Sequence, residues 1–254
     1  MGFPFRVLET GYGQAAFNMG LDEAILESVS TGATLPTLRL YGWNPAAISL
    51  GYFQKMEDEV DVEACRRAGV DIVRRITGGG AVFHEAEVTY SIVIPEGHPL
   101  APPSIAESYG ILCAGIIEGL KPFGLEATFA PINDILVAGR KISGNAQTRK
   151  RGCLLQHGTV LLSVDPEMMF SLLKVPKEKS LGKLIADVKA RVTSLEDALG
   201  RTVAFPETEA ALLDGFVRAL GLDIEKAEPT EMELAAAARL AGEKFSLASW
   251  NARR

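Results

Sequence analysis

The sequence has little cysteine: Cys65, Cys113 and Cys153 are the three among 254 residues. Thiols this few and this far apart exclude a disulfide framework and a cysteine-based zinc site, and they favour the reducing cytoplasm. An excess of basic charge is also missing, because 26 Lys and Arg stand against 32 Asp and Glu, a formal net charge of −6. We therefore expect no nucleic-acid partner, since a protein-wide positive field is absent.

Long apolar runs are missing too. The chain has no stretch of about 18 apolar residues, so we expect no membrane span. Its first residues, MGFPFRVLETGYGQ, lack the basic and apolar regions of a signal peptide. What is present is an ordinary globular composition, 47% hydrophobic and 23% charged, which excludes disorder and supplies a core. We expect a cytoplasmic globular protein.

Hydrophobic periodicity predicts strands and helices in adjacent runs rather than in strict alternation. Helices are predicted over 14–30, 60–70, 105–124, 166–174, 193–199, 206–221 and 233–245. Strands are predicted over 37–43, 46–54, 71–77, 88–95, 133–147 and 153–164, the last two as hairpin partners. Ser104 is the expected cap of the helix over 105–124. This order predicts one α+β domain with a mixed or antiparallel sheet flanked by helices.

The sharpest local motif is RRITGGGAVFHE (74–85), in which three glycines follow a predicted strand. Backbone N–H groups of such a run can approach a ligand closely and form an anion-binding concavity. In a regular strand, Arg74 and Arg75 point to opposite faces, so that one reaches a phosphate while the other meets solvent or a carboxylate. The alternative is a glycine turn between paired strands, flanked by surface arginines. The motif is neither a P-loop nor a dinucleotide fingerprint.

The second motif, GRKISGNAQTRKR (139–151), carries five cations and no acid. If KISGNAQ is extended, Lys141, Ser143 and Asn145 share one face, which suits a ligand with an anion and a carbonyl. For the cations over 149–151 the favoured interpretation is a solvated hairpin with its turn near 148–152. Binding of nucleic acid by this run is not expected, because no aromatic residues are interleaved.

Asn133 and Asp134 precede this motif and allow two interpretations. A carboxylate close to a phosphate site can hold Mg²⁺, or the two residues form an Asx-turn that starts the strand. Among the histidines, His84 directly follows the glycine run and is the better functional candidate. His157 is interpreted as a hydrogen-bonded strand histidine, and no histidine pair has the spacing of a zinc site.

Apolar surroundings predict that Cys153 and Cys113 are small buried hydrophobic residues. Aromatic side chains occur in or beside the predicted strands at Tyr41, Trp43, Tyr52 and Phe53. They are either core residues or walls of an apolar acyl pocket, and the sequence favours the core.

Together these segments resemble the lipoate-protein ligase A family, part of the biotin/lipoate ligase and octanoyltransferase superfamily. The resemblance covers nearly the whole chain and implies a single catalytic domain of biotin/lipoate ligase type over 1–254, with its core at about 30–220. The matching segments are FNMGLDEAIL (17–26), RLYGWNPAAISLGYFQ (39–54), RRITGGGAVFHE (74–85), NDILVAGRKISGNAQTR (133–149), LLQHGTVLL (154–162), LKVPKEKS (173–180) and RVTSLED (191–197).

The resemblance implies a ligase that joins lipoate to ATP with Mg²⁺, giving lipoyl-AMP. The lipoyl group then passes to a lysine of a lipoyl carrier domain, such as a 2-oxoacid dehydrogenase E2 subunit or the glycine cleavage H protein. Two anions meet in the first step, so fixed positive charge is needed where negative charge accumulates. Lys141 is the catalytic residue that the resemblance implies, bridging the acyl carbonyl and the α-phosphate.

Further ligand-binding residues are implied by the same resemblance. Arg75 and the backbone of 78–83 are expected at the phosphates, and Asn133 and Asp134 near the adenylate, with Asp134 as metal ligand. The acyl chain is expected beside Tyr41. The remaining residues implied are Gly78, Gly79, Gly80, Ala81, Val82, Phe83, Ser143 and Gly144, together with Arg39 and His84 at the mouth of the acyl tunnel.

Two departures from the family pattern stand out. The family's His-Asp pair is His84-Glu85 here. The chain also stops about where the catalytic domain ends, so we expect no C-terminal accessory domain. Some family ligases recruit that domain as a separate polypeptide, which leaves open whether adenylation needs an accessory protein.

The alternative function is an octanoyltransferase that moves octanoyl from acyl carrier protein to a lipoyl domain. That family shares the YGWNPA, SLGYFQ, AQTR and WN patterns, but places a nucleophilic cysteine in an insertion that this chain lacks. A thiolate would have to come from Cys153, Cys113 or Cys65, held at low pKa by Lys141. A third hypothesis is a non-catalytic lipoate-handling or carrier-docking protein. The ligase-like NDI at 133–135 favours the ligase.

Overall fold

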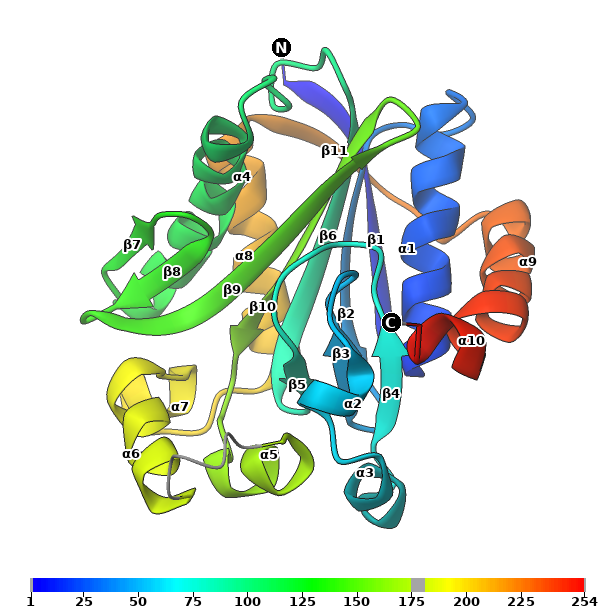
Figure 1. Cartoon of the computed structure of the whole chain (residues 1–254). Coiled ribbons are helices and arrows are strands. Elements are labelled where there is room, and N and C mark those ends of the chain that lie inside the picture. Colours follow the sequence, from blue (N-terminus) through cyan, green and yellow to red (C-terminus); the bar gives the residue numbers. More distant parts are fainter. Residues whose placement is uncertain (1, 175–180, 254) are drawn as a thin grey trace.

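The computed structural model describes residues 2–174 and 181–253, and its centre is an eight-stranded sheet (Figure 1). The strand order is β11-β1-β2-β6-β10-β9-β8-β7, parallel from β11 through β1 to β2 and antiparallel elsewhere. The strands are β1 (Phe3–Gly13), β2 (Thr37–Trp43), β6 (Glu87–Pro95), β7 (Ala127–Ala130), β8 (Asp134–Val137), β9 (Arg140–Lys150), β10 (Cys153–Leu161) and β11 (Leu222–Lys226). The predicted α+β class and mixed sheet are confirmed.

A second, smaller sheet holds the glycine motif. Its order is β4-β3-β5, with β3 (Ala47–Leu50) parallel to β4 (Asp71–Arg74) and antiparallel to β5 (Val82–His84). The glycine run therefore connects two strands that flank β3. The predicted strand over 46–54 ends at Leu50, because Gly51 lies against the run and a Cβ there would meet the Gly79 carbonyl oxygen at 1.9 Å.

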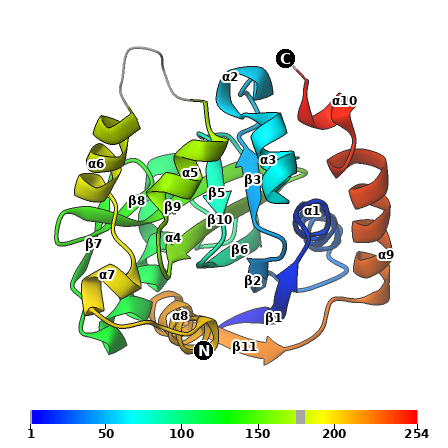
Figure 2. The same cartoon turned by 90° about the horizontal axis from the view of Figure 1, so that it is seen from below.

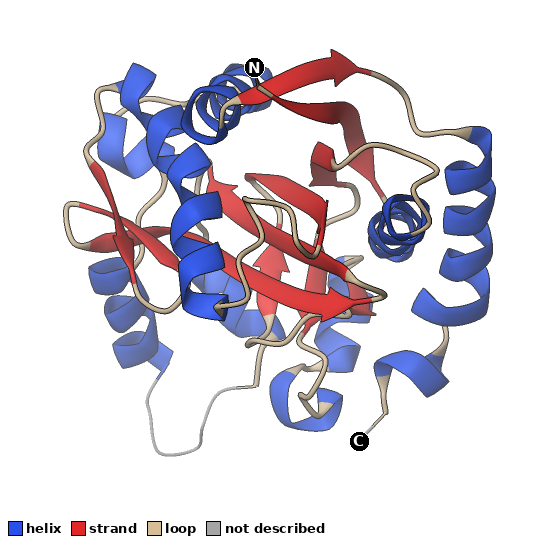
Figure 3. Ribbon diagram, turned by 90° about the horizontal axis from the view of Figure 1, so that it is seen from above, coloured by secondary structure: helices blue, strands red, loops and turns tan. Residues whose placement is uncertain are grey.

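Helices cover both faces of the large sheet. The α-helices are α1 (Ala15–Ser30), α2 (Met56–Glu59), α3 (Val62–Ala68), α4 (Ile105–Leu120), α5 (Pro166–Leu172), α6 (Leu181–Arg191), α7 (Leu195–Leu199), α8 (Phe205–Leu220), α9 (Glu231–Leu240) and α10 (Ala248–Asn251). Helices α4 and α8 lie together on one side, and α1 with α9 on the other (Figures 1 and 3). Helices α5, α6 and α7 gather at one end of the molecule (Figure 2).

The alternation of side chains along β6 explains these layers. Tyr90 and Ile92 belong to the apolar core under α4 and α8, whereas Val93 packs with the core under α1. On the α1 side, however, Thr89 and Ser91 are polar and buried. Buried hydroxyls need hydrogen-bond partners, so this face of the sheet holds a polar network within an otherwise apolar layer.

Most predicted helices and strands are confirmed, with local corrections. Ser104 caps α4, its hydroxyl accepting a hydrogen bond from the Glu107 N–H. The strand predicted over 133–147 is split into β8 and β9 by a turn at Ala138 and Gly139, both with positive φ. Strands β1, β5, β7 and β11 and helices α2, α6 and α10 were not predicted. Of the motif over 173–180, residues 175–180 lie outside the described residues.

No helix within the described ranges combines the length and apolar character that a membrane crossing requires.

A buried ion pair joins β1 to the start of α9. Thr230 and Glu233 form a capping box, and the Glu233 carboxylate also accepts two hydrogen bonds from the Arg6 guanidinium, at 2.6 and 2.9 Å. Burial raises the pKa of Glu233, but the hydrogen bonds from Arg6 and Thr230 outweigh it and hold this pKa below its ordinary value. The pair therefore ties two segments that lie far apart in sequence.

We predict that Glu233→Gln lowers the free energy of unfolding by about 3 kcal/mol, because it keeps the capping box but leaves the buried Arg6 cation unpaired. Chemical denaturation monitored by circular dichroism measures the change. Glu231→Gln, on the exposed side of the same helical turn, is the control and is expected to change the stability by less than about 0.5 kcal/mol. Equal losses in the two variants would contradict the prediction.

Candidate active site

A cavity of about 390 Å³ lies where the small sheet meets β9 and β10. Its volume falls within the range of about 300–1,000 Å³ that is usual for small-molecule sites. The apolar part of its lining includes Met19, Tyr41, Trp43, Ala81, Val82, Phe83, Leu161, Val164, Met169, Val188 and Val192. The polar part includes Ser49, Arg75, His84, Glu87, Thr89, Asn133, Lys141, Asn145, His157 and Thr159. The site can thus hold an apolar chain that ends in a polar group.

Arg75 lies at the centre of the polar part. Its buried guanidinium donates to the carbonyl oxygens of Gly78 and Gly80, at 2.8 and 2.7 Å, and to that of Ser49 at 2.9 Å. It also donates to the hydroxyls of Ser49, at 3.0 Å, and Thr77, at 3.1 Å. Burial lowers the pKa of Arg75 to about 10, so the group stays charged at neutral pH. Arg75 therefore sets the shape of the glycine run from inside the protein.

Arg74 does not meet solvent or a carboxylate, which corrects the prediction for this pair. It is fully buried, and its guanidinium donates to the backbone carbonyls of Gly51 at 2.8 Å, Gln54 at 2.7 Å and Asn251 at 2.7 Å. The Asn251 side chain in turn accepts from the Arg74 backbone N–H at 2.7 Å. Arg74 thus fastens the segment around α10 to the small sheet.

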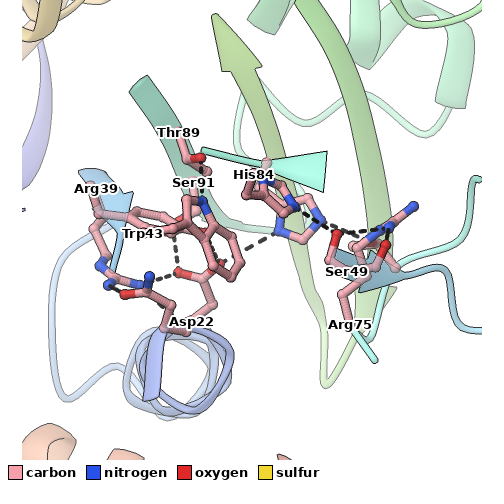
Figure 4. Close-up of polar contacts among 12 residues, drawn as sticks. Asp22, Arg39, Trp43, Ser49, Arg75, His84, Thr89 and Ser91 are labelled. Carbon is pink, nitrogen blue, oxygen red and sulfur yellow. Dashed lines mark hydrogen bonds and ion pairs between the residues drawn. The ribbon is translucent and has the colours of Figure 1, made fainter. Parts of the chain in front are cut away.

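Two hydroxyl–imidazole–carboxylate chains start at Arg75. In the first, Ser49 Oγ lies 2.7 Å from Nε2 of His84, whose Nδ1 hydrogen-bonds to Oε1 of Glu87 (Figure 4). The Glu87 carboxylate can only accept, so Nδ1 carries a proton; in the neutral ring, Nε2 then accepts from the Ser49 hydroxyl. Trp43 stacks on the His84 ring, with centroids 4.1 Å apart. The geometry fixes both the tautomer and the orientation of His84.

The second chain runs from Thr77 to His157 and Asp22. Thr77 Oγ1 lies 2.7 Å from Nε2 of His157, and Nδ1 of that ring lies 3.5 Å from the Asp22 carboxylate. Burial lowers the pKa of His157, although the nearby Asp22 carboxylate acts in the opposite direction. His157 is therefore a hydrogen-bonded strand histidine as predicted, and it also lines the cavity.

Arg39 was expected at the mouth of the acyl tunnel and instead lies behind the cavity. It is 1% exposed and is not among the residues that line the cavity. Its guanidinium donates to Asp22 at 2.8 Å and to the Asn18 side chain at 2.7 Å, and stacks over the Tyr41 ring (Figure 4). Arg39 thus supports Tyr41, which does line the cavity. Phe53, by contrast, is exposed and lies outside it.

Lys141 lines the same cavity as Gly79 and Gly80. Its side chain is 40% exposed, and its ammonium lies 2.7 Å from the Asp134 carboxylate. A register shift between Ile135 and Leu136 of the neighbouring strand interrupts the alternation along β9. As a result Lys141 packs over Gly144, where a Cβ would lie 2.7 Å from Nζ.

That register shift corrects the expected row of Lys141, Ser143 and Asn145. Ser143 is fully buried and does not reach the cavity, whereas Asn145 does. The Asn145 amide donates to the Asn133 carbonyl at 2.9 Å, and the Asn133 amide donates back to the Asn145 carbonyl. Asn133 therefore fixes the start of β8 through pairing across strands.

Asp134, expected as a metal ligand, already faces the Lys141 ammonium. In the part of the chain that the structure describes, no group of three or more His, Cys, Asp or Glu side chains is placed to hold a metal ion. The role of Asp134 as a metal ligand therefore stays a prediction, and in this structure its carboxylate is paired with Lys141.

The cysteines are buried away from the cavity, as predicted for Cys113 and Cys153. All three are free thiols within the described residues, and none lines the cavity. Burial raises the pKa of Cys65 to about 11 and that of Cys113 to about 12, and it also raises the pKa of Cys153. No thiol is held at low pKa by Lys141, which corrects that expectation.

Of the expected ligand-binding residues, the structure brings Arg75, Tyr41, Asn133, Lys141, Gly144 and the run from Gly79 to His84 to the cavity. Gly78 contacts Arg75 instead, through its carbonyl. Sequence reasoning missed Ser49, Thr77 and Glu87. Ser49 could have been identified from the sequence, because it is a polar side chain inside the apolar segment AISL (47–50).

Comparison with known proteins gives consistent matches over nearly the whole chain. The lipoyl protein ligase A/B catalytic domain matches residues 14–217. Over 98% of both chains, the sequence is 40% identical to octanoyltransferase LipM of Geobacillus kaustophilus and 34% identical to octanoyltransferase LipM of Bacillus subtilis. A solved structure from Thermoplasma acidophilum, described with a bi-partite lipoate protein ligase and its E2 lipoyl domain, has a TM-score of 0.87 at 31% identity and covers 99% of this chain and 96% of its own.

We predict that the protein loses stability as the pH falls from about 7 to about 5. The folded state holds His157 neutral, with a pKa below the ordinary value of 6.5, whereas the unfolded chain binds the proton at that value. Stability from this group is thus complete above the unfolded pKa and is lost as the pH falls. The slope of unfolding free energy against pH should be shallower in His157→Gln. Parallel slopes would show that His157 does not carry the effect.

Proposed function

This chain belongs to the lipoyl protein ligase A/B catalytic domain family, and from that premise we propose that it is an octanoyltransferase. It takes octanoyl from the thioester of an acyl carrier protein and joins it to a lysine of a lipoyl domain. The full-length similarity to octanoyltransferases LipM is the observation that carries this proposal.

The preferred prediction from sequence, an ATP-dependent lipoate ligase, is wrong. Relatives that align with this chain from end to end, at 34% and 40% identity, are octanoyltransferases. The ligase prediction rested on motifs that both activities share and on the NDI segment. Transfer from a thioester needs neither ATP nor Mg²⁺, because the acyl carbon is already activated. The phosphate-binding role expected of Arg75 and the glycine run stays a prediction.

The cavity supports transfer of a medium-length acyl chain. Its apolar wall, which includes Trp43, Val82 and Leu161, suits the hydrocarbon part of octanoyl. Its polar part suits the carbonyl, and the Lys141 ammonium is the exposed cation there. The buried network behind Tyr41 keeps this wall rigid, which favours one position of the reacting carbonyl.

The overall transfer exchanges a thioester for an amide. The acyl carbon leaves the carrier sulfur, which departs as a thiol, and it forms a C–N bond with the lysine of the acceptor domain. That amine has to be neutral to attack, so it gives up one proton in the process. Each attack on the carbonyl places negative charge on its oxygen. We assign the stabilisation of this oxyanion to Lys141.

Transfer is tested with octanoyl acyl carrier protein and an apo E2 lipoyl domain, in buffer without ATP. We expect the domain to gain one octanoyl group on its lysine, detected by mass spectrometry. The control reaction replaces the donor with free octanoate, and it should leave the domain unmodified even with ATP and Mg²⁺ present. Modification only with free acid and ATP would refute the transferase.

We predict that Lys141→Ala lowers kcat/KM for octanoyl transfer about 10²–10³-fold, the usual loss when one oxyanion donor is removed. Lys150→Ala is the matched control, since it removes a lysine of the same strand that lies outside the cavity. Steady-state rates of the two variants decide the matter. An unimpaired Lys141→Ala enzyme would remove this ammonium from the mechanism.

A further inference from the structure

We propose that Met19 closes the acyl end of the cavity and limits the transferred chain to the length of octanoyl. The inference rests on the proposed octanoyltransferase function and adds the residue that selects the length of its substrate. Met19 belongs to α1, and it lines the cavity together with Tyr41 and Trp43. These three side chains are buried in the same apolar cluster under α1.

The cavity has an open end and a closed end. At the open end, the glycines at 79–80 and Asp165 are exposed, and the Lys141 side chain is 40% exposed. At the other end, Met19 is 4% exposed and Tyr41 is fully buried. A thioester on a carrier protein reaches the cavity from its exposed end. The acyl chain therefore enters past Lys141, and its methyl end points to Met19.

One row of cross-strand neighbours connects the two ends. The row consists of Tyr41 on β2, Thr89 on β6, Thr159 on β10 and Gly144 on β9, each paired with the next. All of them line the cavity, and the Lys141 side chain packs over Gly144. Cross-strand neighbours project from the same face of a sheet. The row therefore forms a floor of small residues that runs from Lys141 to Tyr41.

The length of this floor matches an octanoyl chain. Neighbouring strands lie about 4.8 Å apart, so the steps from β9 through β10 and β6 to β2 cover about 14 Å. An extended chain of eight carbons spans about 9 Å from its carbonyl carbon to its methyl carbon. The methyl carbon also needs a van der Waals contact of about 4 Å with the wall. With its carbonyl beside the Lys141 ammonium, the chain thus ends at Tyr41 and Met19.

Met19 is the part of this end wall whose size sets the depth of the cavity. Tyr41 is fixed by its hydroxyl, which donates to Asp22 at 3.1 Å. Trp43 is fixed by its indole, which donates to the Thr89 hydroxyl at 2.8 Å (Figure 4). Met19 is instead an unbranched apolar side chain that is held by packing. A smaller residue at position 19 should therefore deepen the cavity and leave the polar network in place.

These dimensions predict how the rate depends on chain length. Each methylene that enters an apolar pocket raises kcat/KM about fourfold. In the natural enzyme, we expect kcat/KM to rise about 16-fold from hexanoyl to octanoyl. It should then fall about tenfold from octanoyl to decanoyl, because the longer chain has to displace Met19 or Tyr41. Met19→Ala shortens the side chain by about three methylene lengths, so this variant should transfer decanoyl faster than octanoyl.

The test measures transfer to an apo E2 lipoyl domain from acyl carrier protein loaded with hexanoyl, octanoyl, decanoyl or dodecanoyl. Met19→Ala should raise the ratio of decanoyl to octanoyl kcat/KM at least about tenfold, and Met19→Phe should shift the preference toward hexanoyl. Met169→Ala is the matched control, because Met169 lines the cavity from α5, next to the open end, and its loss should leave the preference for octanoyl unchanged. An unchanged ratio in Met19→Ala would overturn the inference. A natural enzyme that transfers dodecanoyl as fast as octanoyl would overturn it without any variant.

A binding measurement separates this inference from the proposed function. Calorimetry uses S-(2-oxoalkyl) thioethers of N-acetylcysteamine with chains of the same lengths, which keep the carbonyl but cannot transfer the chain. The tightest binding should move from the octanoyl length in the natural enzyme to the decanoyl length in Met19→Ala. If binding moves in this way but no thioester donor supports transfer, the proposed function fails and the role of Met19 stands. If transfer occurs and neither measurement shifts, Met19 does not limit the chain and the transferase function stands. Circular dichroism of each variant confirms that the fold is retained.

Discussion

The site depends on one buried cation, the Arg75 guanidinium. Removing this group from water is costly, and the structure offsets the cost with five acceptors on Ser49, Thr77, Gly78 and Gly80. Two consequences follow from the same bonds. The carbonyls of the glycine run turn inward and fix the wall of the cavity, and the Ser49 and Thr77 hydroxyls are held beside His84 and His157. A structural cation thereby orders the polar groups of the candidate site.

Strand β4, which ends next to Arg75, is also held in place by the C-terminal residues. Arg74 binds the backbone around Asn251, and the Trp250 indole donates to the Arg74 carbonyl at 2.8 Å. The segment that follows α9 therefore supports β4, the strand that leads directly into Arg75. Because α9 is in turn tied to β1 through Glu233 and Arg6, the end of the chain and its beginning both stabilise the position of the cavity.

Local patterns predicted what depends on local sequence. The glycine run, His84 and Lys141 were found because each lies in a short motif of unusual composition, and the burial of Cys113 followed from its apolar helix. The hydrogen-bonded chain of Ser49, His84 and Glu87 could not be found in this way, since Ser49 lies in a different segment and reaches His84 through the pairing of β3 with β5. Ser143 was misplaced because a one-residue register shift changes the face of a strand. The choice between ligase and transferase failed because it rested on motifs that both activities share and on the NDI segment.

The two activities have part of their chemistry in common. An adenylate and a thioester are both activated acyl groups, and each needs an apolar wall for the chain and positive charge at the carbonyl oxygen. Trp43, Val82 and Lys141 supply these features whichever activated acyl group arrives. A transferase that carries the acyl group on one of its own side chains needs a hydroxyl or thiol with a base beside it that accepts its proton. In this chain the three thiols are buried and lie outside the cavity. The features that the structure shares with any acyl-transfer site are therefore the apolar wall and the cation, and these are what the sequence motifs encode.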